Sequence, residues 1–382
     1  MSAHRLAALQ LNLVPGLGPR TTAVLLDHLG SAEAILEADP ESLLRVPGVG
    51  PQLVRSIRAH RDLSTARRES ARCRAANVDL LLSSDAGYPC RLREVDDPPH
   101  LLYCRGQLDP ADQWSIAVVG ARHCTSYGRR QAESLAAGLA QHGWTIVSGL
   151  ARGIDAAAHR ASLEAGGRTL AVLASGVVHI YPPEHRDLAD AVTEQGGLLS
   201  EMSTLQKPVA GLFPQRNRII SGLSLAVIIV EAGERSGSLH TARHALEQGR
   251  DVFAVPGRVD SWASAGCHAL IRDGVVLVRD LTDVLESLSP VGSQIGSSPS
   301  CNTSPSEPDQ PPVSGLSAAE HELLSIVPAC PTSMDQIVRL SGWDTARVLS
   351  ILTQLEVHQL IERLPGSTVR RTVTLDTYQD HG

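Results

Sequence analysis

Short apolar runs alternate with amphipathic stretches through residues 113–285 of the chain. The runs are rich in valine, isoleucine and leucine, and most are separated by stretches with a helical pattern: SIAVVG, TIVSG, TLAVLAS, GGLLSE, LAVIIVEA, DVFAVPG and VVLV. Continuous apolar strands with helices between them are typical of a parallel sheet that is covered on both faces. The pattern therefore predicts an α/β core over residues 113–287, and ligands of such sheets bind at the carboxyl ends of the strands.

A second pattern occurs twice in residues 1–75. VPGLGP and VPGVGP each precede a stretch with a helical pattern. Proline and glycine there indicate a tight turn between two short helices, and the second helix begins with exposed backbone N–H groups. The arrangement resembles a tandem of helix-hairpin-helix (SAM-like) motifs, a class that holds DNA phosphates without sequence preference. A small helical bundle that only packs or dimerises is the alternative, and residues 76–112 are expected to connect this domain to the core.

The C-terminal part of the chain changes composition abruptly. Residues 288–315 consist mainly of serine, proline and glycine, a composition that buries too little apolar surface to order the chain, so we predict a disordered linker. Residues 316–378 follow with three helical patterns and a short terminal hairpin, which predicts a winged helix with Asp344 and Thr345 capping its third helix. Acidic residues outnumber arginines in this part, which argues against direct DNA contact by the winged helix.

Composition places the chain among ordinary soluble proteins. It has 382 residues, of which 42% are hydrophobic and 20% charged, enough for two or three domains. Its seven cysteines contain no C-x-x-C pair, so we expect reduced thiols in the cytoplasm and neither a disulfide framework nor a metal site. The N-terminus shows no signal-peptide pattern, and no apolar run approaches the ~20 residues of a membrane helix.

The net charge of −7 at first disfavours nucleic acid as a partner. Residues 113–285, however, carry 15 arginines and one lysine against 16 acidic residues, so the core is neutral and can still present a local basic groove. Lys207 is the only lysine in the sequence. A glycine loop followed by lysine, as in a nucleotide-binding P-loop, is therefore excluded.

The first strand of the core ends in the motif IAVVGARHCTSYGRR. Gly120 and Gly128 are its only glycines, whereas a dinucleotide fingerprint needs G-x-G-x-x-G, so NAD and FAD are disfavoured and no cofactor is expected. Arg122 instead places a planar, permanently charged group at the end of the strand, where it suits a phosphate oxygen. The alternative is an ordinary turn with an exposed arginine.

The second strand ends in VSGLARGIDAAAH. Gly149 and Gly153 permit a close approach of another backbone, and Asp155 is a candidate cap for the helix whose first amides bind an anion. Arg152 adds a positive charge beside them. A glycine-rich turn that is capped only for stability is the alternative interpretation.

Two further motifs carry polar groups of the same kind. In FPQRNRIISGLS, Arg216 and Arg218 flank Asn217. Because residues two apart on a helix point to different faces, one arginine can face a cleft while the other braces the fold. In VEAGERSGSLHTARHALEQG, a strand ends at Glu231 and Ser236-Gly237-Ser238 precede a helix. A structural arginine pair and an ordinary serine cap are the respective alternatives.

We place all four motifs at the carboxyl edge of one predicted sheet. A single phosphate needs one or two such turns, whereas a sugar–phosphate chain uses several. The four together therefore favour a nucleic-acid backbone as the ligand. Aromatic residues make up only 3% of the chain, so we expect phosphate contacts to outweigh base stacking, with Tyr127 and Tyr181 the nearby candidates for stacking.

These motifs, together with YPPEH, ALEQGRDVFAVPG and GCHALIRDG, resemble the DprA/Smf family of DNA-processing proteins. The resemblance covers the whole of residues 113–285, and the N-terminal repeat and the C-terminal winged helix agree with it. It implies an extended Rossmann-like core that binds single-stranded DNA without cleaving it and loads the RecA recombinase during natural transformation. The DNA-binding residues that it implies are Arg122, Ser148, Gly149, Arg152, Gly153, Arg216, Asn217, Arg218, Ser236, Gly237 and Ser238.

The same resemblance implies a homodimer, formed through the C-terminal half of the core, and a contact with RecA in the same region. The implied contact residues lie in CHALIRDG and are His268, Leu270, Ile271 and Arg272. The chain departs from the family pattern at Gln215, where a basic residue is expected before RNR, and at Ala121, His240 and His268. We expect these departures to change affinities rather than the site itself.

The competing hypothesis is an enzyme on a related core, a nucleotide phosphoribohydrolase. The catalytic turn of that class has a motif similar to P-G-G-x-G-T-x-x-E, where this chain has EAGERSGSLHTARHALE. The arginine and glutamate needed for cleavage have no convincing counterpart here. A DNA-repair enzyme, suggested by the N-terminal repeats, lacks a recognisable catalytic cluster, so we predict a non-catalytic protein.

Overall fold

A computed structural model of the chain describes residues 1–288, 318–327, 332–357, 360–364 and 368–371. The chain divides into two compact units, Met1–Pro299 and Ser300–Gly382. Within the described ranges no helix is both long and apolar enough to cross a membrane. Apart from Leu288, the predicted linker 288–315 lies outside the described residues, as do residues 372–378 of the predicted winged helix.

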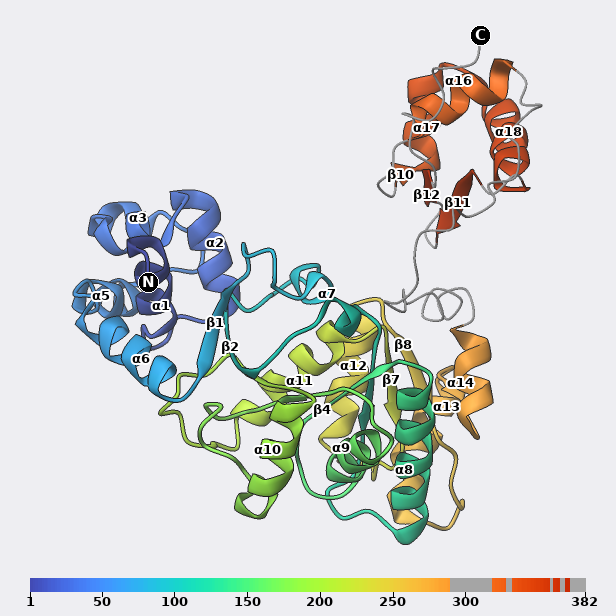
Figure 1. The fold of residues 1–382 in the computed structure, drawn as a ribbon. Coiled ribbons are helices and arrows are strands. Elements are labelled where there is room, and N and C mark those ends of the chain that lie inside the picture. The colour runs from blue at the N-terminus through green and yellow to red at the C-terminus, as the bar shows by residue number, and fades with distance from the viewer. Residues whose placement is uncertain (289–317, 328–331, 358–359, 365–367, 372–382) are drawn as a thin grey trace, which may run out of the picture. The chain divides into compact units, whose positions relative to one another are not determined.

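A nine-stranded sheet forms the centre of the first unit, in the order β1-β2-β6-β5-β4-β3-β7-β8-β9 (Figure 1). Its strand order reverses at β3, which pairs with β4 on one side and with β7 on the other. Seven strands correspond to the predicted apolar runs and pair in parallel, which confirms the Rossmann-like α/β core: β3 (Ser115–Val119), β4 (Thr145–Ser148), β5 (Thr169–Val172), β6 (Gly196–Ser200), β7 (Ala226–Ile229), β8 (Asp251–Ala254) and β9 (Val276–Leu277).

Two strands of this sheet were not predicted. The connecting segment 76–112 supplies β1 (Val78–Leu82) and β2 (Leu101–Gly106), which extend the sheet beyond β6 in antiparallel fashion. This segment also contains the short helix α7 (Cys90–Arg93) and a 3₁₀ turn at Pro110–Gln113. The segment is thus part of the sheet and not a simple connector.

Helices cover both faces of the sheet. Successive side chains of each strand point to opposite faces, so each apolar strand presents apolar side chains to both layers of helices. On one face, Ile116 and Val118 pack with α8 (Ser126–Gln141), α9 (Ile154–Glu164) and α14 (Leu281–Ser287). On the other, Ala117 and Val119 pack in a cluster with three helices: α11 (Leu212–Leu223), α12 (Ser238–Glu247) and α13 (Ala265–Arg272). The remaining elements of the core are α10 (Arg186–Glu194) and 3₁₀ turns at Pro183–His185 and Trp262–Ser264.

The N-terminal region is helical and contains the predicted hairpin tandem. In both repeats a glycine with φ of +81°, Gly16 and Gly48, makes the turn, and the following helix begins at a proline. The helices pack on the β1–β2 edge through one shared apolar cluster, in which Leu9 and Ala66 join Tyr103. They are α1 (Ala3–Asn12), α2 (Pro19–Leu29), α3 (Ala32–Glu37), α4 (Pro40–Leu44), α5 (Pro51–Ala59) and α6 (Ser64–Ala75).

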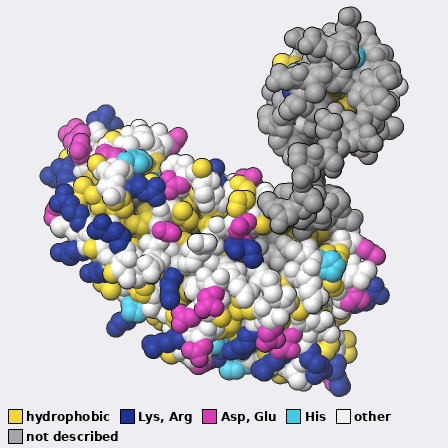
Figure 2. All heavy atoms as spheres, viewed as in Figure 1, with side chains coloured by type: hydrophobic (Ala, Val, Ile, Leu, Met, Phe, Trp, Pro, Cys, Tyr) yellow, Lys and Arg dark blue, Asp and Glu magenta, His cyan; other side chains and the backbone are white. Residues whose placement is uncertain are grey.

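The surface charge differs between these two regions. On the face drawn in Figure 2, arginine side chains gather over the N-terminal helices, whereas both signs of charge are mixed over the α/β core. Residues 1–75 carry ten arginines against seven acidic residues, while residues 113–285 are balanced. A basic groove in the core must therefore be local.

The second unit has the three predicted helices and the predicted hairpin, with one further strand, around its own apolar cluster. The side chain of Asp344 accepts a hydrogen bond of 3.0 Å from the Arg347 amide, so it caps the third helix as expected. The elements are α16 (Ala318–Ile326), α17 (Met334–Ser341), α18 (Thr345–Val357) and a three-stranded sheet of β10 (Thr332–Ser333), β12 (Thr368–Arg371) and β11 (Ile361–Leu364).

Candidate nucleic-acid interface

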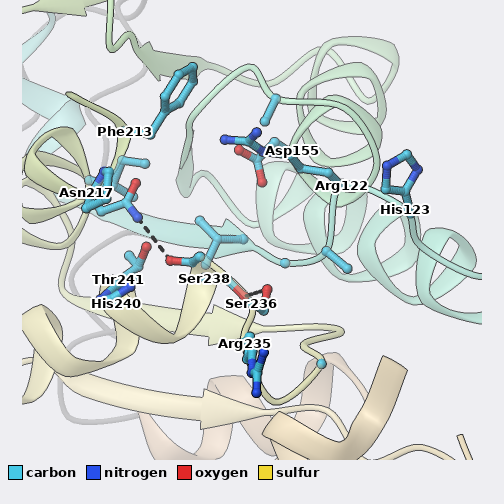
Figure 3. Close-up of a pocket in the computed structure, with 18 of the residues that line it drawn as sticks. Arg122, His123, Asp155, Phe213, Asn217, Arg235, Ser236, Ser238, His240 and Thr241 are labelled. Carbon is cyan, nitrogen blue, oxygen red and sulfur yellow. Dashed lines mark hydrogen bonds between the residues drawn. The ribbon is translucent and has the colours of Figure 1, made fainter. Parts of the chain in front are cut away.

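A pocket of about 850 Å³ opens at the point where the strand order reverses. It lies beyond the carboxyl ends of β3 and β7, the place where open α/β sheets bind their ligands. The turn after β3, the turn after β7 and the first turns of α11 line it (Figure 3), with Arg122, Phe213, Arg216, Asn217 and the segment 233–238 among the lining residues. The structure thus brings residues of all four sequence motifs to one opening, the second motif through Ala151 and Asp155.

Arg122 occupies the exposed side of this pocket. Its guanidinium carbon lies 4.7 Å from the centroid of the Phe213 ring, a cation–π contact. The Phe213 ring in turn meets the Tyr181 ring edge-to-face, at 5.9 Å between centroids and 65° between planes. The aromatic ring holds the arginine by its face, so the N–H groups of the guanidinium stay available for an anion.

The N-terminus of α12 forms the opposite side. The hydroxyls of Ser236 and Ser238 are 2.8 Å apart, and the Asn217 side-chain amide donates to the Gly237 carbonyl at 3.1 Å. Gly237 is the N-cap and has no side chain to cap the helix. The Leu239 and His240 amides donate to the Ser236 and Gly237 carbonyls at 3.2 Å. The Gly237 and Ser238 amides, the two hydroxyls and the positive end of the helix dipole face the pocket, which favours an anion. Arg235 is exposed on the same lining.

Arg216 and Asp155 form the buried side of the pocket. Arg216 donates from Nη1 to the carbonyls of Gly149, at 2.8 Å, and Val172. Burial lowers the pKa of Arg216 to about 10, although the nearby Asp155 carboxylate opposes that shift. Burial likewise raises the pKa of Asp155, although the positive charge of Arg216 opposes that shift. The guanidinium is thus engaged with the ends of β4 and β5 and holds them together.

Asp155 does not cap the helix in the expected way. The N-cap of α9 is Gly153, and Asp155 lies inside the first turn. Its Oδ2 accepts the Gly149 amide at 3.2 Å. The prediction of a helix cap is therefore corrected: the carboxylate instead fixes the turn that precedes the helix.

Contacts within the protein explain why Gly149 and Gly153 stand in the β4–α9 turn. A Cβ on Gly149 would lie 2.4 Å from the Arg216 guanidinium, and a Cβ on Gly153 would lie 2.2 Å from the Ala121 carbonyl. Gly153 also has a φ of +76°, a conformation that side chains disfavour. Packing within the protein therefore accounts for both glycines without a ligand backbone against them.

Five of the eleven expected DNA-binding residues do not line the pocket: Ser148, Gly149, Arg152, Gly153 and Arg218. Ser148 is fully buried and donates to the Val118 carbonyl at 2.7 Å. Arg152 is exposed but forms an ion pair with Glu184 at 2.6 Å.

Arg218 lies on the face of α11 that points away from the pocket. Its Nη2 is 2.7 Å from both carboxylate oxygens of Glu201, and its Nη1 donates to the Asp97 carbonyl at 2.6 Å. The Arg218 side chain is buried and that of Glu201 is 13% exposed. As the spacing of two predicted, Arg216 and Arg218 face opposite ways, and Arg218 braces the fold.

Sequence reasoning missed Phe213 as a candidate for stacking. It named Tyr127 and Tyr181, but the Tyr127 hydroxyl donates to the Pro256 carbonyl at 2.7 Å and the residue is not part of the lining. Tyr181 does lie at the site, through its contact with Phe213. The sequence feature that could have identified Phe213 is its position at the start of the third motif.

The expected dimer and RecA residues lie on α13, at the end of the sheet formed by β8 and β9. His268 hydrogen-bonds the Gly257 carbonyl through Nε2 at 3.1 Å, and Leu270 and Ile271 pack partly on the core. The Arg272 side chain is exposed. The neighbouring edge strand β9 exposes Val276 and Leu277, so this edge offers apolar surface and unpaired backbone groups.

Comparisons with known proteins agree with this architecture. A family model described as DNA recombination-mediator protein A matches residues 79–289. Models for the DprA winged helix domain and for a SAM-like helix-hairpin-helix tandem match residues 307–367 and 9–60. The combination of these three parts defines a DNA-processing protein with a Rossmann-like core.

Individual relatives extend the match over most of the chain. Protein Smf from Synechocystis is 35% identical, over 94% of this chain and 96% of the relative. Protein Smf from Escherichia coli is 41% identical, over 82% and 83% respectively. The chain belongs to the DNA recombination-mediator protein A family, which confirms the resemblance drawn from the sequence.

Two solved structures are also similar. The X-ray structure of DprA from Streptococcus pneumoniae gives a TM-score of 0.64 at 34% identity, and the match covers 75% of this chain and 98% of that one. The structure of DNA processing protein A from Helicobacter pylori, described for its single-stranded DNA binding mode, gives 0.51 at 29% identity. That match covers 56% of this chain and 95% of the other.

Proposed function

We propose that this protein binds single-stranded DNA in the pocket between the turns after β3 and β7. The observation that carries the proposal is the pairing of Arg122 with Phe213 across from the open N-terminus of α12. One side offers a cation beside an aromatic ring, and the other offers amides and hydroxyls. The description of the Helicobacter pylori relative as a single-stranded DNA binder supports the same ligand.

The pocket suits a flexible strand. Arg122 and the Gly237 and Ser238 amides at the start of α12 would each take a phosphate oxygen, and the exposed face of Phe213 or Tyr181 would take a base. These contacts involve no base edge, so binding would be independent of sequence and would weaken as salt rises. A duplex keeps its bases stacked inside and cannot use the rings in this way.

A titration of labelled oligonucleotides tests this proposal. We expect a single strand to bind more tightly than a duplex of the same length, with a linear fall of log affinity against log salt. Equal affinity for both would contradict the assignment of the pocket. A parallel incubation with AMP tests the enzyme hypothesis, since release of adenine would identify a phosphoribohydrolase.

We further propose that the protein acts as a non-catalytic mediator that loads RecA on incoming strands in natural transformation. The family description as a recombination mediator supports this role. Residues His268, Leu270, Ile271 and Arg272 would supply both the homodimer contact and the RecA contact. The apolar surface of β9 beside them suits a second copy of the chain. Sedimentation would report the dimer, and the rate of RecA assembly on protein-coated single strands would report loading.

A further inference from the structure

Thr204 lies where two loops of the α/β core meet the N-terminal helices. The first loop follows β5 and leads to Tyr181, and the second follows β6 and leads to Phe213. The Gly176 amide of the first loop donates to the Gln206 carbonyl of the second at 2.9 Å. A Cβ on Gly176 would lie 2.2 Å from the Ser203 carbonyl and 2.7 Å from the Thr204 carbonyl. The two loops therefore touch backbone to backbone at this point.

The N-terminal helices hold this junction through a carboxylate. Glu69 of α6 accepts the Thr204 amide at Oε1, at a distance of 2.6 Å. Its other oxygen accepts from Arg72 at 3.1 Å. Glu69 and Thr204 are only 2% and 1% exposed, so water does not compete for the bond and its loss would leave a buried amide without a partner.

A second bond joins the same regions. The Asn12 side-chain amide of α1 donates to the Glu201 carbonyl at 3.4 Å, and the Glu201 carboxylate pairs with Arg218 of α11. Phe213 lies in the first turns of that helix. The N-terminal helices are thus connected to the start and to the body of the segment that carries Phe213.

We infer that Glu69 is a positioning residue for the aromatic side of the pocket. By holding Thr204 it fixes the two loops that place Tyr181 against Phe213, and hence the ring over which Arg122 lies. The N-terminal helices then contribute to DNA binding through the shape of the pocket. This inference rests on the proposed function, because it assigns the aromatic pair the task of stacking on bases.

Two ligands separate this role from general stabilisation. The first is an oligonucleotide with bases, and the second is an abasic phosphodiester of the same length, which has phosphates but nothing to stack. For Glu69→Ala we expect the affinity for the first to fall about tenfold, the loss of roughly one stacked base, while the affinity for the second stays unchanged. Glu69→Gln keeps an acceptor for the Thr204 amide and should retain most of the affinity.

Gly176→Ala disturbs the same junction from the other side, by pushing on the Ser203 and Thr204 carbonyls with Glu69 intact. It should reproduce the selective loss even if Glu69→Ala does not fold. Glu41→Ala is the matched control, because it removes an exposed acidic side chain from the same helical region. An unchanged ratio of the two affinities in folded Glu69→Ala or in Gly176→Ala would overturn the inference.

Hydrogen exchange gives a readout that does not depend on DNA. The amides of residues 203–213 should exchange faster in Glu69→Ala than in the unaltered protein, and those of the turn after β3 should not. If the unaltered protein binds neither ligand, the proposed function fails. Hydrogen exchange alone then decides whether Glu69 holds residues 203–213. Equal exchange rates in Glu69→Ala and in the unaltered protein would show that it does not.

Discussion

The guanidinium of Arg122 lies over the ring of Phe213, with 4.7 Å between the guanidinium carbon and the ring centroid. The two residues come from different motifs, one after β3 and the other at the start of α11. Their contact joins a phosphate-binding group to a stacking surface. It also indicates how the contributions of charge and of stacking to DNA binding can be measured separately.

Replacing Arg122 with alanine should weaken single-strand binding and flatten its dependence on salt. The lost phosphate contact is worth about 1.5 kcal/mol, as for hydrogen bonds to charged groups, and the slope of log affinity against log salt should become shallower by roughly 0.7. Fluorescence anisotropy at several salt concentrations measures both. Arg243→Ala removes an exposed arginine that pairs with Glu247 and should leave both unchanged. An unaltered slope in Arg122→Ala would remove Arg122 from the site.

Replacing Phe213 with alanine should weaken binding by about 1–3 kcal/mol, the typical value of one base–aromatic stack. The slope against salt should change much less than in Arg122→Ala, because phosphate contacts remain. Phe213→Tyr keeps the ring face and serves as the control. A loss that is equal for oligonucleotides with and without bases would contradict the stacking role.

Arg218→Ala should act on stability and not on the salt dependence of DNA binding. It would leave the largely buried Glu201 carboxylate without its main partner, at a cost of about 3 kcal/mol. Urea denaturation measures this loss. The double variant with Glu201→Ala should recover part of it, since neither charge then remains. A folded Arg218→Ala of normal stability, with a flattened salt slope, would instead support direct contact with DNA.

Acid should destabilise the protein partly through His159. Its Nδ1 lies 2.7 Å from the Thr169 hydroxyl, which donates to the Ile146 carbonyl, so Nδ1 carries the proton. Nε2 is buried and has no partner among the described residues. Burial lowers the pKa of His159 to about 3. The folded protein therefore keeps the ring neutral, whereas the unfolded chain takes up a proton below its ordinary pKa of about 6.5.

The sign of this effect follows from the depressed pKa. The stability contribution is complete above pH 6.5 and is lost as pH falls towards 3, at up to about 1.4 kcal/mol per pH unit. His159→Asn keeps a donor for Thr169 and should lose less stability than the unaltered protein between pH 7.5 and pH 4.5. Parallel curves for the two proteins would show that other groups cause the acid loss.

A chain that ends at residue 288 should retain single-strand binding. The pocket lies wholly within the first compact unit, and the winged helix forms a unit with its own apolar cluster. We expect the affinity and the salt slope to match those of the full chain. A collapse of binding in a folded truncated protein would make the winged helix the DNA reader.

Much of the fold could be predicted because it depends on local patterns. Continuous apolar runs between helical stretches indicate parallel strands; all seven runs form such strands, and six of them are largely buried while the edge strand β9 is exposed. The VPG–GP repeats produce turns at Gly16 and Gly48 for a purely local reason, the positive φ of each glycine. The Asp344 cap is likewise decided by residues three apart in the chain.

The site could be predicted only in part. The sequence by itself placed Arg122, Asn217 and the Ser236–Ser238 turn at the edge of the sheet, because each directly follows a strand or begins a helix. It also determined that Arg216 and Arg218 face opposite ways, but not which one faces the pocket. That depended on Glu201 and Asp97, which meet Arg218 only after β1, β2 and β6 have paired.

Tertiary structure alone decided the remaining features, because each needs a partner that is distant in the chain. Gly149 is required by the guanidinium of Arg216, and Phe213 becomes a binding surface only beside Arg122 and Tyr181. The bond from Glu69 to the Thr204 amide joins the N-terminal helices to the loops of the core. A carboxylate in an arginine-rich helix gives no local sign of such a contact, since only packing determines that it is buried.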